Sequence, residues 1–154
     1  MGAPKSVVKV KKNGVEYTSN VDACEYYIYE LNRAALRDVA KFVKRRFRDS
    51  FYQHFDRRSG NAGRATSSVV MSNKDSKYPR VEIGLKRKTL KGVYGYEQEF
   101  GTSNIPKLGL LQSSVEDNIA QIVEIESKYL SALEDEARAL ALIDESEHTD
   151  DGEE

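Results

Sequence analysis

The chain has no tryptophan, only one cysteine and only three prolines. The single cysteine, Cys24, excludes an internal disulfide framework and a cysteine-rich zinc site, which suits a reducing compartment. No segment approaches the run of about 18 apolar residues that a membrane span needs, and residues 1–13 lack the apolar stretch of a signal peptide. These absences predict a soluble protein that is made in the cytoplasm and has no membrane partner.

The residues that enzymes commonly use are also sparse. The two histidines, His54 and His148, lie in segments that we do not expect to meet, and neither has a serine or cysteine partner nearby in the sequence. Glu97 and Glu99 would share one face of a strand, as paired glycosidase carboxylates can, but a solvated or subunit-contact face is the commoner reason for this spacing. The acidic residues 150–154 lack the spacing of an EF-hand. The sequence therefore predicts no catalytic residues, no cofactor and no metal.

The charges are divided between the two halves of the chain. The formal net charge is −1, yet residues 1–91 hold 21 Lys and Arg against 9 Asp and Glu, whereas residues 92–154 hold 3 against 16. Halves of opposite charge attract each other, within one subunit or between subunits. The alternative is that the charges of each half only keep its own surface solvated and have no role in binding.

A hairpin and a long helix are predicted at the N-terminal end. Residues 7–10 and 15–17 read as two short strands around Asn13-Gly14, a pair that tolerates the positive φ angles of a tight turn. Apolar residues at helical spacing then predict a helix over about residues 21–55, which Ser19 or Asn20 can cap.

Basic residues crowd one side of this helix and continue into a glycine-containing loop at residues 56–66. Phe47, Phe51 and Phe55 are spaced by four residues, which indicates a core stripe on the helix and not a stacking platform for bases. The basic side chains can neutralise phosphates without reading base edges, so we expect them to face any DNA that passes nearby. They are Lys41, Lys44, Arg45, Arg46, Arg48, Arg57, Arg58 and Arg64.

The rest of the chain predicts a small sheet and a second long helix. Residues 68–71, 81–85 and 93–98 read as strands of an antiparallel sheet. An apolar stripe then predicts a helix of about 30 residues that Ser113 or Ser114 caps.

We expect an α+β fold in which the two long helices pack on the sheet. A single domain covers residues 1–143, including a hairpin arm at residues 1–18. Residues 144–154 hold seven acidic residues in eleven and are expected to be disordered.

The run that begins at Tyr96 and ends at Pro106 is predicted to be a structured junction. Gly101 can turn the chain at positive φ, and the proline fixes φ in the segment that follows. We expect Phe100 to hold this junction in place by being buried. The residues assigned to the junction are Tyr96, Glu99, Phe100, Gly101, Thr102 and Pro106.

The junction, its downstream proline, the apolar patch at residues 108–111 and the closing helix resemble the minor-tail or tail-completion proteins of tailed double-stranded DNA phages. Upstream, the basic helix, residues 64–69 and the strand at residues 81–85 occur in the order found in that family. The likeness covers about residues 22–140. Leu108-Gly109-Leu110 stands where that family usually has Pro-Phe-hydrophobic, and Ala65 stands where Leu is common.

The resemblance implies a structural virion protein of the neck or tail end, active in tail completion or head–tail joining, and no enzyme. It implies a ring of identical subunits, hexameric in such proteins, that closes head to tail around the DNA channel. The partners would be other copies of the chain, neighbouring neck and tail proteins, and the passing genomic DNA. Leu108, Leu110 and Leu111 are the expected subunit or partner contacts.

Two other functions are open on the residues alone. The first is a nucleic-acid-binding accessory protein without sequence specificity, which would use the basic helix over residues 41–58. The second is an adaptor whose acidic tail imitates nucleic acid toward a basic partner.

Overall fold

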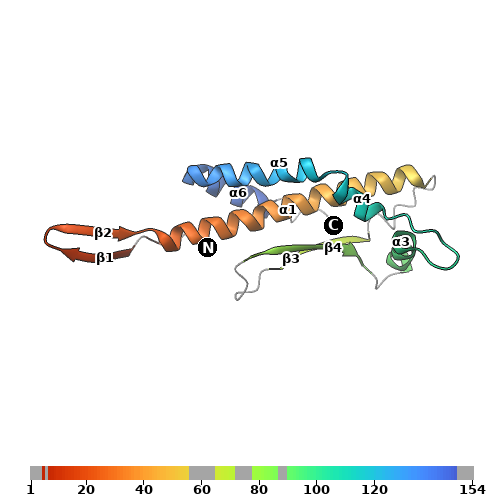
Figure 1. Cartoon of the computed structure of the whole chain (residues 1–154), viewed down its shortest axis with the longest axis horizontal. Coiled ribbons are helices and arrows are strands. Elements are labelled where there is room, and N and C mark those ends of the chain that lie inside the picture. The colour runs from red at the N-terminus through yellow and green to blue at the C-terminus, as the bar shows by residue number, and fades with distance from the viewer. Residues whose placement is uncertain (1–4, 6, 56–64, 72–77, 87–89, 149–154) are drawn as a thin grey trace.

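The computed structural model describes residues 5, 7–55, 65–71, 78–86 and 90–148. A long helix forms the axis of an elongated molecule, with a two-stranded sheet along one side and the C-terminal helices along the other (Figure 1). In chain order the elements are β1 (Val7–Lys12), β2 (Val15–Ser19), α1 (Val21–His54), β3 (Thr66–Met71), β4 (Arg80–Leu85), α3 (Leu90–Phe100), α4 (Leu110–Glu116), α5 (Ile119–Leu130), the 3-10 helix η1 (Ser131–Glu134) and α6 (Glu136–His148). The predicted α+β class is confirmed.

The hairpin and the first helix are confirmed nearly to the residue. Asn13 and Gly14 both adopt positive φ, 53° and 78°, as the tight turn between β1 and β2 requires. Asn20 takes the N-cap position of α1 without a side-chain capping bond, so the expected cap at Ser19 or Asn20 does not form. The buried side chains of α1 recur every three or four residues and are Leu31, Ala34, Ala35, Val39, Ala40, Val43, Phe47 and Phe51.

One core cluster joins the first half of α1 to the C-terminal helices. Leu31, Ala34 and Ala35 pack against buried residues of α5, η1 and α6, which are Tyr129, Ala132, Ala139, Leu142 and Ile143. The small alanine side chains allow the helices to approach closely. The Tyr129 hydroxyl donates to Asp38 Oδ2, and Arg37 donates to Ser146 Oγ at 3.1 Å, so α5 and α6 are each tied to α1.

A second cluster lies at the other end of α1. Phe47 and Phe51 are buried there, and Leu85, Leu110 and Leu111 pack against them from β4 and α4. β3 and β4 pair antiparallel, from Thr66 opposite Leu85 to Met71 opposite Arg80. The second cluster therefore joins α1, the sheet and the start of the C-terminal helices.

The third predicted strand, at residues 93–98, is wrong because this segment lies inside α3. The helix places the buried Gly95 and Glu99 on one face, four residues apart, and packs next to β4. The expected shared strand face of Glu97 and Glu99 does not exist for the same reason.

The prediction of a single C-terminal helix of about 30 residues is also wrong, because the chain bends twice in this region. Asp117 and Asn118 separate α4 from α5, and the side-chain amide of Asn118 donates to the Ser114 carbonyl at 3.1 Å. Asp135 ends η1, and its carboxylate accepts from the backbone of Ala137 and Arg138 at the start of α6. This second bend lets α6 turn back and pack on α1, which α5 also contacts (Figure 1).

The helix boundaries correct two further expectations. Ser113 and Ser114 lie inside α4 and do not cap it; the Ser114 hydroxyl donates instead to the Leu110 carbonyl at 2.6 Å. The expected disorder of residues 144–154 is wrong for residues 144–148, which belong to α6, where Ser146 is buried. Residues 149–154 lie outside the described part of the chain.

Two phenols make stability depend on pH at the alkaline end. Burial and the bond to Asp38 raise the pKa of Tyr129, and the bond to Glu136, at 2.5 Å, raises the pKa of Tyr27 to about 12. Because both pKa values are higher in the folded than in the unfolded chain, these groups stabilise the fold below about pH 10, and the contribution disappears as the pH rises through the folded values.

Tyr129→Phe should lower the free energy of unfolding by about 1.5–3 kcal/mol at neutral pH, because a hydrogen bond to a carboxylate is lost. It should also reduce the loss of stability that the wild type shows above about pH 10. Urea unfolding followed by circular dichroism measures both, with Tyr17→Phe on the exposed hairpin as control. A Tyr129→Phe variant with wild-type stability both at neutral pH and above about pH 10 would contradict the assigned bond.

Candidate functional site

The junction predicted between Tyr96 and Pro106 is a compact turn between α3 and α4. The Gly101 amide donates to the Glu97 carbonyl at 2.8 Å and ends α3, and Gly101 has a φ of 77°. Thr102 closes the following turn, because its backbone amide donates to the Ile105 carbonyl at 2.8 Å. Its hydroxyl oxygen accepts from the amides of Asn104 and Ile105 at 3.3 and 3.1 Å.

Glu99 connects this turn to α4. Its side chain is only 5% exposed, and its carboxylate accepts from the backbone amides of Leu111 at 2.8 Å and Gln112 at 3.1 Å. The N-cap residue of α4 is Gly109, which has no side chain to offer. The Glu99 carboxylate therefore satisfies two of the free amides in the first turn of α4 and places negative charge at the positive end of the helix dipole.

Phe100 has a different position from the one predicted. It is 59% exposed, and its ring lies against that of Tyr96, one helical turn earlier, with 4.6 Å between the centroids. The expectation that Phe100 holds the junction by burial is wrong, because the buried face of α3 carries Gly95 and Glu99. Pro106 is exposed as well.

Gly101→Ala tests the junction. A Cβ at this position would lie 2.9 Å from the backbone nitrogen of Lys107 and 3.1 Å from the Ile105 carbonyl oxygen, and an alanine would be strained at this φ. We expect a loss of about 2–3 kcal/mol in the free energy of unfolding, the sum of the left-handed backbone and the close contact. Gly84→Ala is the matched control, because nothing lies within 4 Å of a Cβ there. Equal thermal and urea stability of the two variants would contradict the proposed strain.

The three leucines predicted to contact partners lie beside this junction. Leu110 and Leu111 pack against the Phe47 and Phe51 cluster of their own chain, so both are partly used in the core. Leu108 is half-buried, and its amide donates to the Gln98 carbonyl at 2.9 Å. A subunit contact at these leucines stays a prediction.

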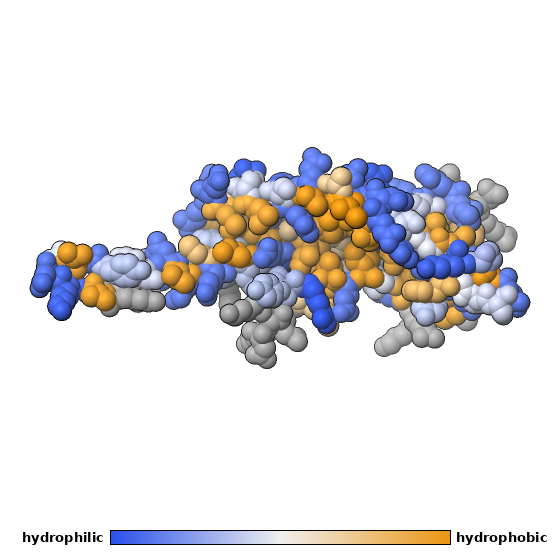
Figure 2. Space-filling view, in the orientation of Figure 1, coloured by the Kyte–Doolittle hydropathy of each residue, from blue (hydrophilic) through white to orange (hydrophobic). Residues whose placement is uncertain are grey.

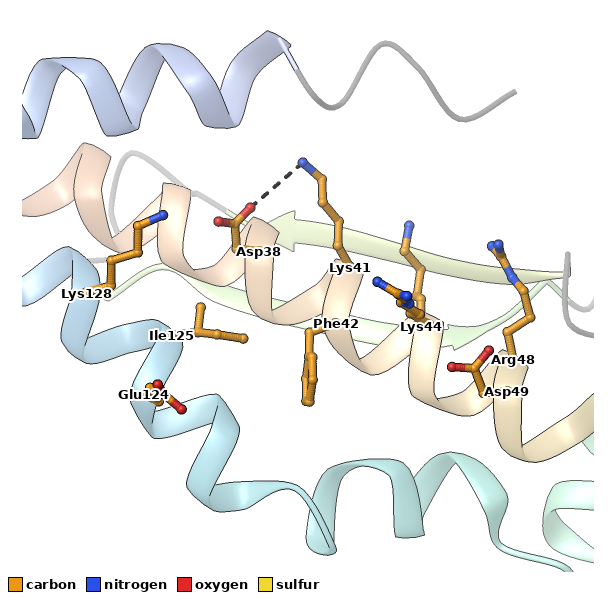
Figure 3. A pocket seen from close by; sticks show the side chains of 10 residues that line it. Asp38, Lys41, Phe42, Lys44, Arg48, Asp49, Glu124, Ile125 and Lys128 are labelled. Carbon is orange, nitrogen blue, oxygen red and sulfur yellow. Dashed lines mark ion pairs between the residues drawn. The ribbon is translucent and has the colours of Figure 1, made fainter. Parts of the chain in front are cut away.

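The predicted basic surface forms an open groove of about 1050 Å³ on α1, which we call the basic groove. Lys41, Lys44 and Arg48 project to the same side of α1 (Figure 3), and Arg45 also lines the groove. Arg46 instead places its guanidinium over the Phe42 ring, 5.2 Å from the centroid. Arg57, Arg58 and Arg64 lie outside the described residues.

Four charged residues of the basic groove were not expected from the sequence. Lys128 adds a fifth cation from α5, whereas Asp38, Asp49 and Glu124 place three carboxylates beside the cations. Lys41 approaches Asp38 to 3.9 Å. Because five cations face three anions, the net positive charge of the groove is much smaller than the basic residues of α1 alone suggest. α5 is distant from α1 in the sequence, so no local sequence signal indicates that Lys128 and Glu124 line this groove. Only the packing of α5 on α1 brings them there.

The described residues do not assemble a metal site. No group of three or more His, Cys, Asp or Glu side chains among them could hold a metal ion. His54 is exposed at the end of α1, and Cys24 is exposed near its start. In the part of the chain that the structure describes, no helix has the length and apolar character of a bilayer-spanning segment.

Comparison with known proteins identifies no significant match. No protein-family model matches the chain, and no curated protein or solved structure matches it significantly.

Proposed function

We propose that the chain is a structural protein of a tailed-phage virion. In this proposal it acts at the neck or tail end in tail completion or head–tail joining, as a ring of identical subunits around the DNA channel. The observation that carries the proposal is the junction from Tyr96 to Pro106, which resembles the tail-completion proteins in sequence. Its Glu99, Gly101 and Thr102 all serve one turn that connects α3 to the C-terminal helices.

Exposed apolar surface supports a role in assembly. Large apolar side chains lie exposed along the C-terminal helices, on α4, α5, η1 and α6: Val115, Ile119, Val123, Leu130, Leu133 and Leu140. Contiguous exposed apolar surface usually marks a contact with another protein. The basic N-terminal and acidic C-terminal halves would steer such a contact and fix its register.

Absolute mass in solution tests the assembly directly. Light scattering over a range of protein concentrations should find one discrete species larger than the monomer at low salt. At high salt this species should dissociate more readily, because the charges on the contacting faces are screened. Negative-stain images should show closed rings with a central opening. A monomer at all concentrations and both salts, without rings, would contradict self-assembly of the free chain.

A genetic experiment tests the place in the virion. In a phage that carries this gene, disrupting it should leave filled heads and separate tails that do not join to them, and the wild-type chain supplied in trans should restore infectious particles. Normal virions without the chain would overturn the virion role, whatever the chain does in solution.

The basic groove supports a second candidate function, binding of nucleic acid through phosphates. Lys44, Arg45 and Arg48 line the open groove, so phosphates could pair with their cationic groups. Changing Lys44, Arg45 and Arg48 together to Glu should abolish duplex binding and remove its salt dependence. The matched control changes the exposed Lys86, Lys107 and Arg138 to Glu. Equal loss in both variants would indicate a general charge effect, and no duplex binding by the wild type would exclude this candidate.

A further inference from the structure

The hairpin β1–β2, which we call the arm, extends beyond the rest of the molecule (Figure 1). Its strands pair with each other, and neither makes a substantial contact with any other element that the structure describes. A two-stranded hairpin alone is marginally stable in water. The arm is therefore the one described element whose folding would benefit most from a partner.

One face of the arm is apolar. Val10 pairs with Tyr17, and Lys12 pairs with Val15, so these four side chains lie on the same face, while Lys11 and Glu16 form an ion pair on the other. The apolar side chains are 54%, 58% and 70% exposed for Val10, Tyr17 and Val15. Three large apolar side chains on one exposed face are typical of a surface that binds another protein.

An open apolar groove of about 280 Å³ lies between α1, η1, α5 and the two residues that precede β4, and we call it the apolar groove. Figure 2 shows apolar side chains gathered on the arm and over the middle of the body, where α1 runs between α5 and the β3–β4 sheet. The apolar residues that line the groove include Ile28, Leu31, Leu36, Tyr78, Leu130 and Leu133. Four of them, Ile28, Tyr78, Leu130 and Leu133, are exposed.

The charges around the two surfaces are complementary. Residues 5–19 carry four lysines against one glutamate, and Lys12 lies on the apolar face itself. Glu126 lines the apolar groove, and the C-terminal half of the chain, which forms one wall, is strongly acidic. Opposite charges at such a contact speed association and fix its register.

We infer that the arm of one copy binds in the apolar groove of a second copy of the chain. The arm cannot easily reach its own groove, because only Asn20 separates β2 from α1 and the arm points away from the body along the helix (Figure 1). The contact joins two different surfaces, so repetition gives a ring or an open filament. The inference deepens the proposed function and rests on it only in that both require self-association.

Single-cysteine variants test the contact. In a Cys24→Ser background, Tyr17→Cys is placed in one protein and Leu133→Cys in another, and the two are mixed under mild oxidation. We expect disulfide-linked heterodimers at least about tenfold above the controls, because docking brings the two thiols to a high effective concentration. The controls are Thr18→Cys, on the opposite face of the arm, and Val123→Cys, which does not line the groove.

A second measurement does not depend on disulfide geometry. Val10→Ser with Tyr17→Ser should weaken self-association at least about tenfold in light scattering, since two apolar side chains leave the contact. Glu16→Ser with Thr18→Ser, on the other face, should change it little. The body of the fold, followed by circular dichroism, should be unaffected because the arm makes no substantial contact with it.

The outcomes separate this inference from the proposed function. Rings that persist in the Val10→Ser and Tyr17→Ser variant, without the cross-link, would overturn the inference and leave the assembly role standing. Cross-linked open chains without closed rings would support the inference and count against the ring. Heterodimers no more abundant than in the controls, with a strictly monomeric wild type, would also overturn the inference.

Discussion

Replacing Phe47 by Ala is expected to lower the free energy of unfolding by about 3–5 kcal/mol, as truncation of a fully buried aromatic side chain usually does. Phe47 is 1% exposed and lies 5.7 Å from Phe51, ring centroid to centroid. Leu85 from β4 and Leu110 from α4 pack on the same cluster. The cavity would therefore open where α1, the sheet and the C-terminal helices meet. Urea unfolding by circular dichroism at fixed pH measures the loss.

Phe100→Ala is the matched control, because it removes the same atoms from a side chain that is 59% exposed. It should cost no more than about 1 kcal/mol, chiefly from the lost ring contact with Tyr96. If the two truncations had the same effect, or if Phe100→Ala were the more damaging, the assignment of the core to the Phe47 cluster would be wrong.

The elements that the sequence predicted well are those with strong local signals. The Asn13-Gly14 pair specifies its turn by backbone conformation alone, and α1 repeats its apolar residues over 34 residues. β3 and β4 are short but are flanked by chain-breaking residues, so their existence could be predicted. Each of these signals lies within a few residues of the element that it specifies.

α3 was predicted as a strand because its local signals favour one. Val93, Tyr94 and Tyr96 are β-forming residues, and Gly92 and Gly95 each disfavour a helix by about 1 kcal/mol. The helix is favoured by contacts outside the segment: it buries Glu99 beneath α4 and presents the Gln98 and Glu99 carbonyls to the amides of Leu108 and Gly109. Tertiary contacts overrode propensity here.

The C-terminal breaks were missed for a related reason. The apolar stripe continues through Asp117 and Asp135 with little change, so periodicity alone reads one helix. The breaks become visible only when α5 and α6 must both cover the alanine-rich part of α1. At the candidate site, the turn at Gly101 could be predicted from the residue type. The burial of Glu99 and the exposure of Phe100 could not, because they depend on where α4 begins.

Glu99→Met should lower the free energy of unfolding by about 3–5 kcal/mol, because two hydrogen bonds to a charged group are lost together. Met has a similar length and no acceptor of comparable strength, so the amides of Leu111 and Gln112 would be left unpaired at the first turn of α4. Gly109, at the N-cap, cannot replace the lost acceptor. Glu99→Gln should show a smaller loss, because its amide oxygen can still accept one of the two bonds.

Glu97→Met is the control for the Glu99 variants, since Glu97 lies two residues earlier on α3 and is partly exposed. Its effect should stay within about 0.5 kcal/mol. Hydrogen exchange adds a local measurement: the amides of Leu111 and Gln112 should lose protection in Glu99→Met more than those in the middle of α1. Protection of α4 unchanged in Glu99→Met would show that the carboxylate does not cap the helix. The junction would then depend on the backbone turn at Gly101, and the Gly101→Ala variant would become the more damaging of the two.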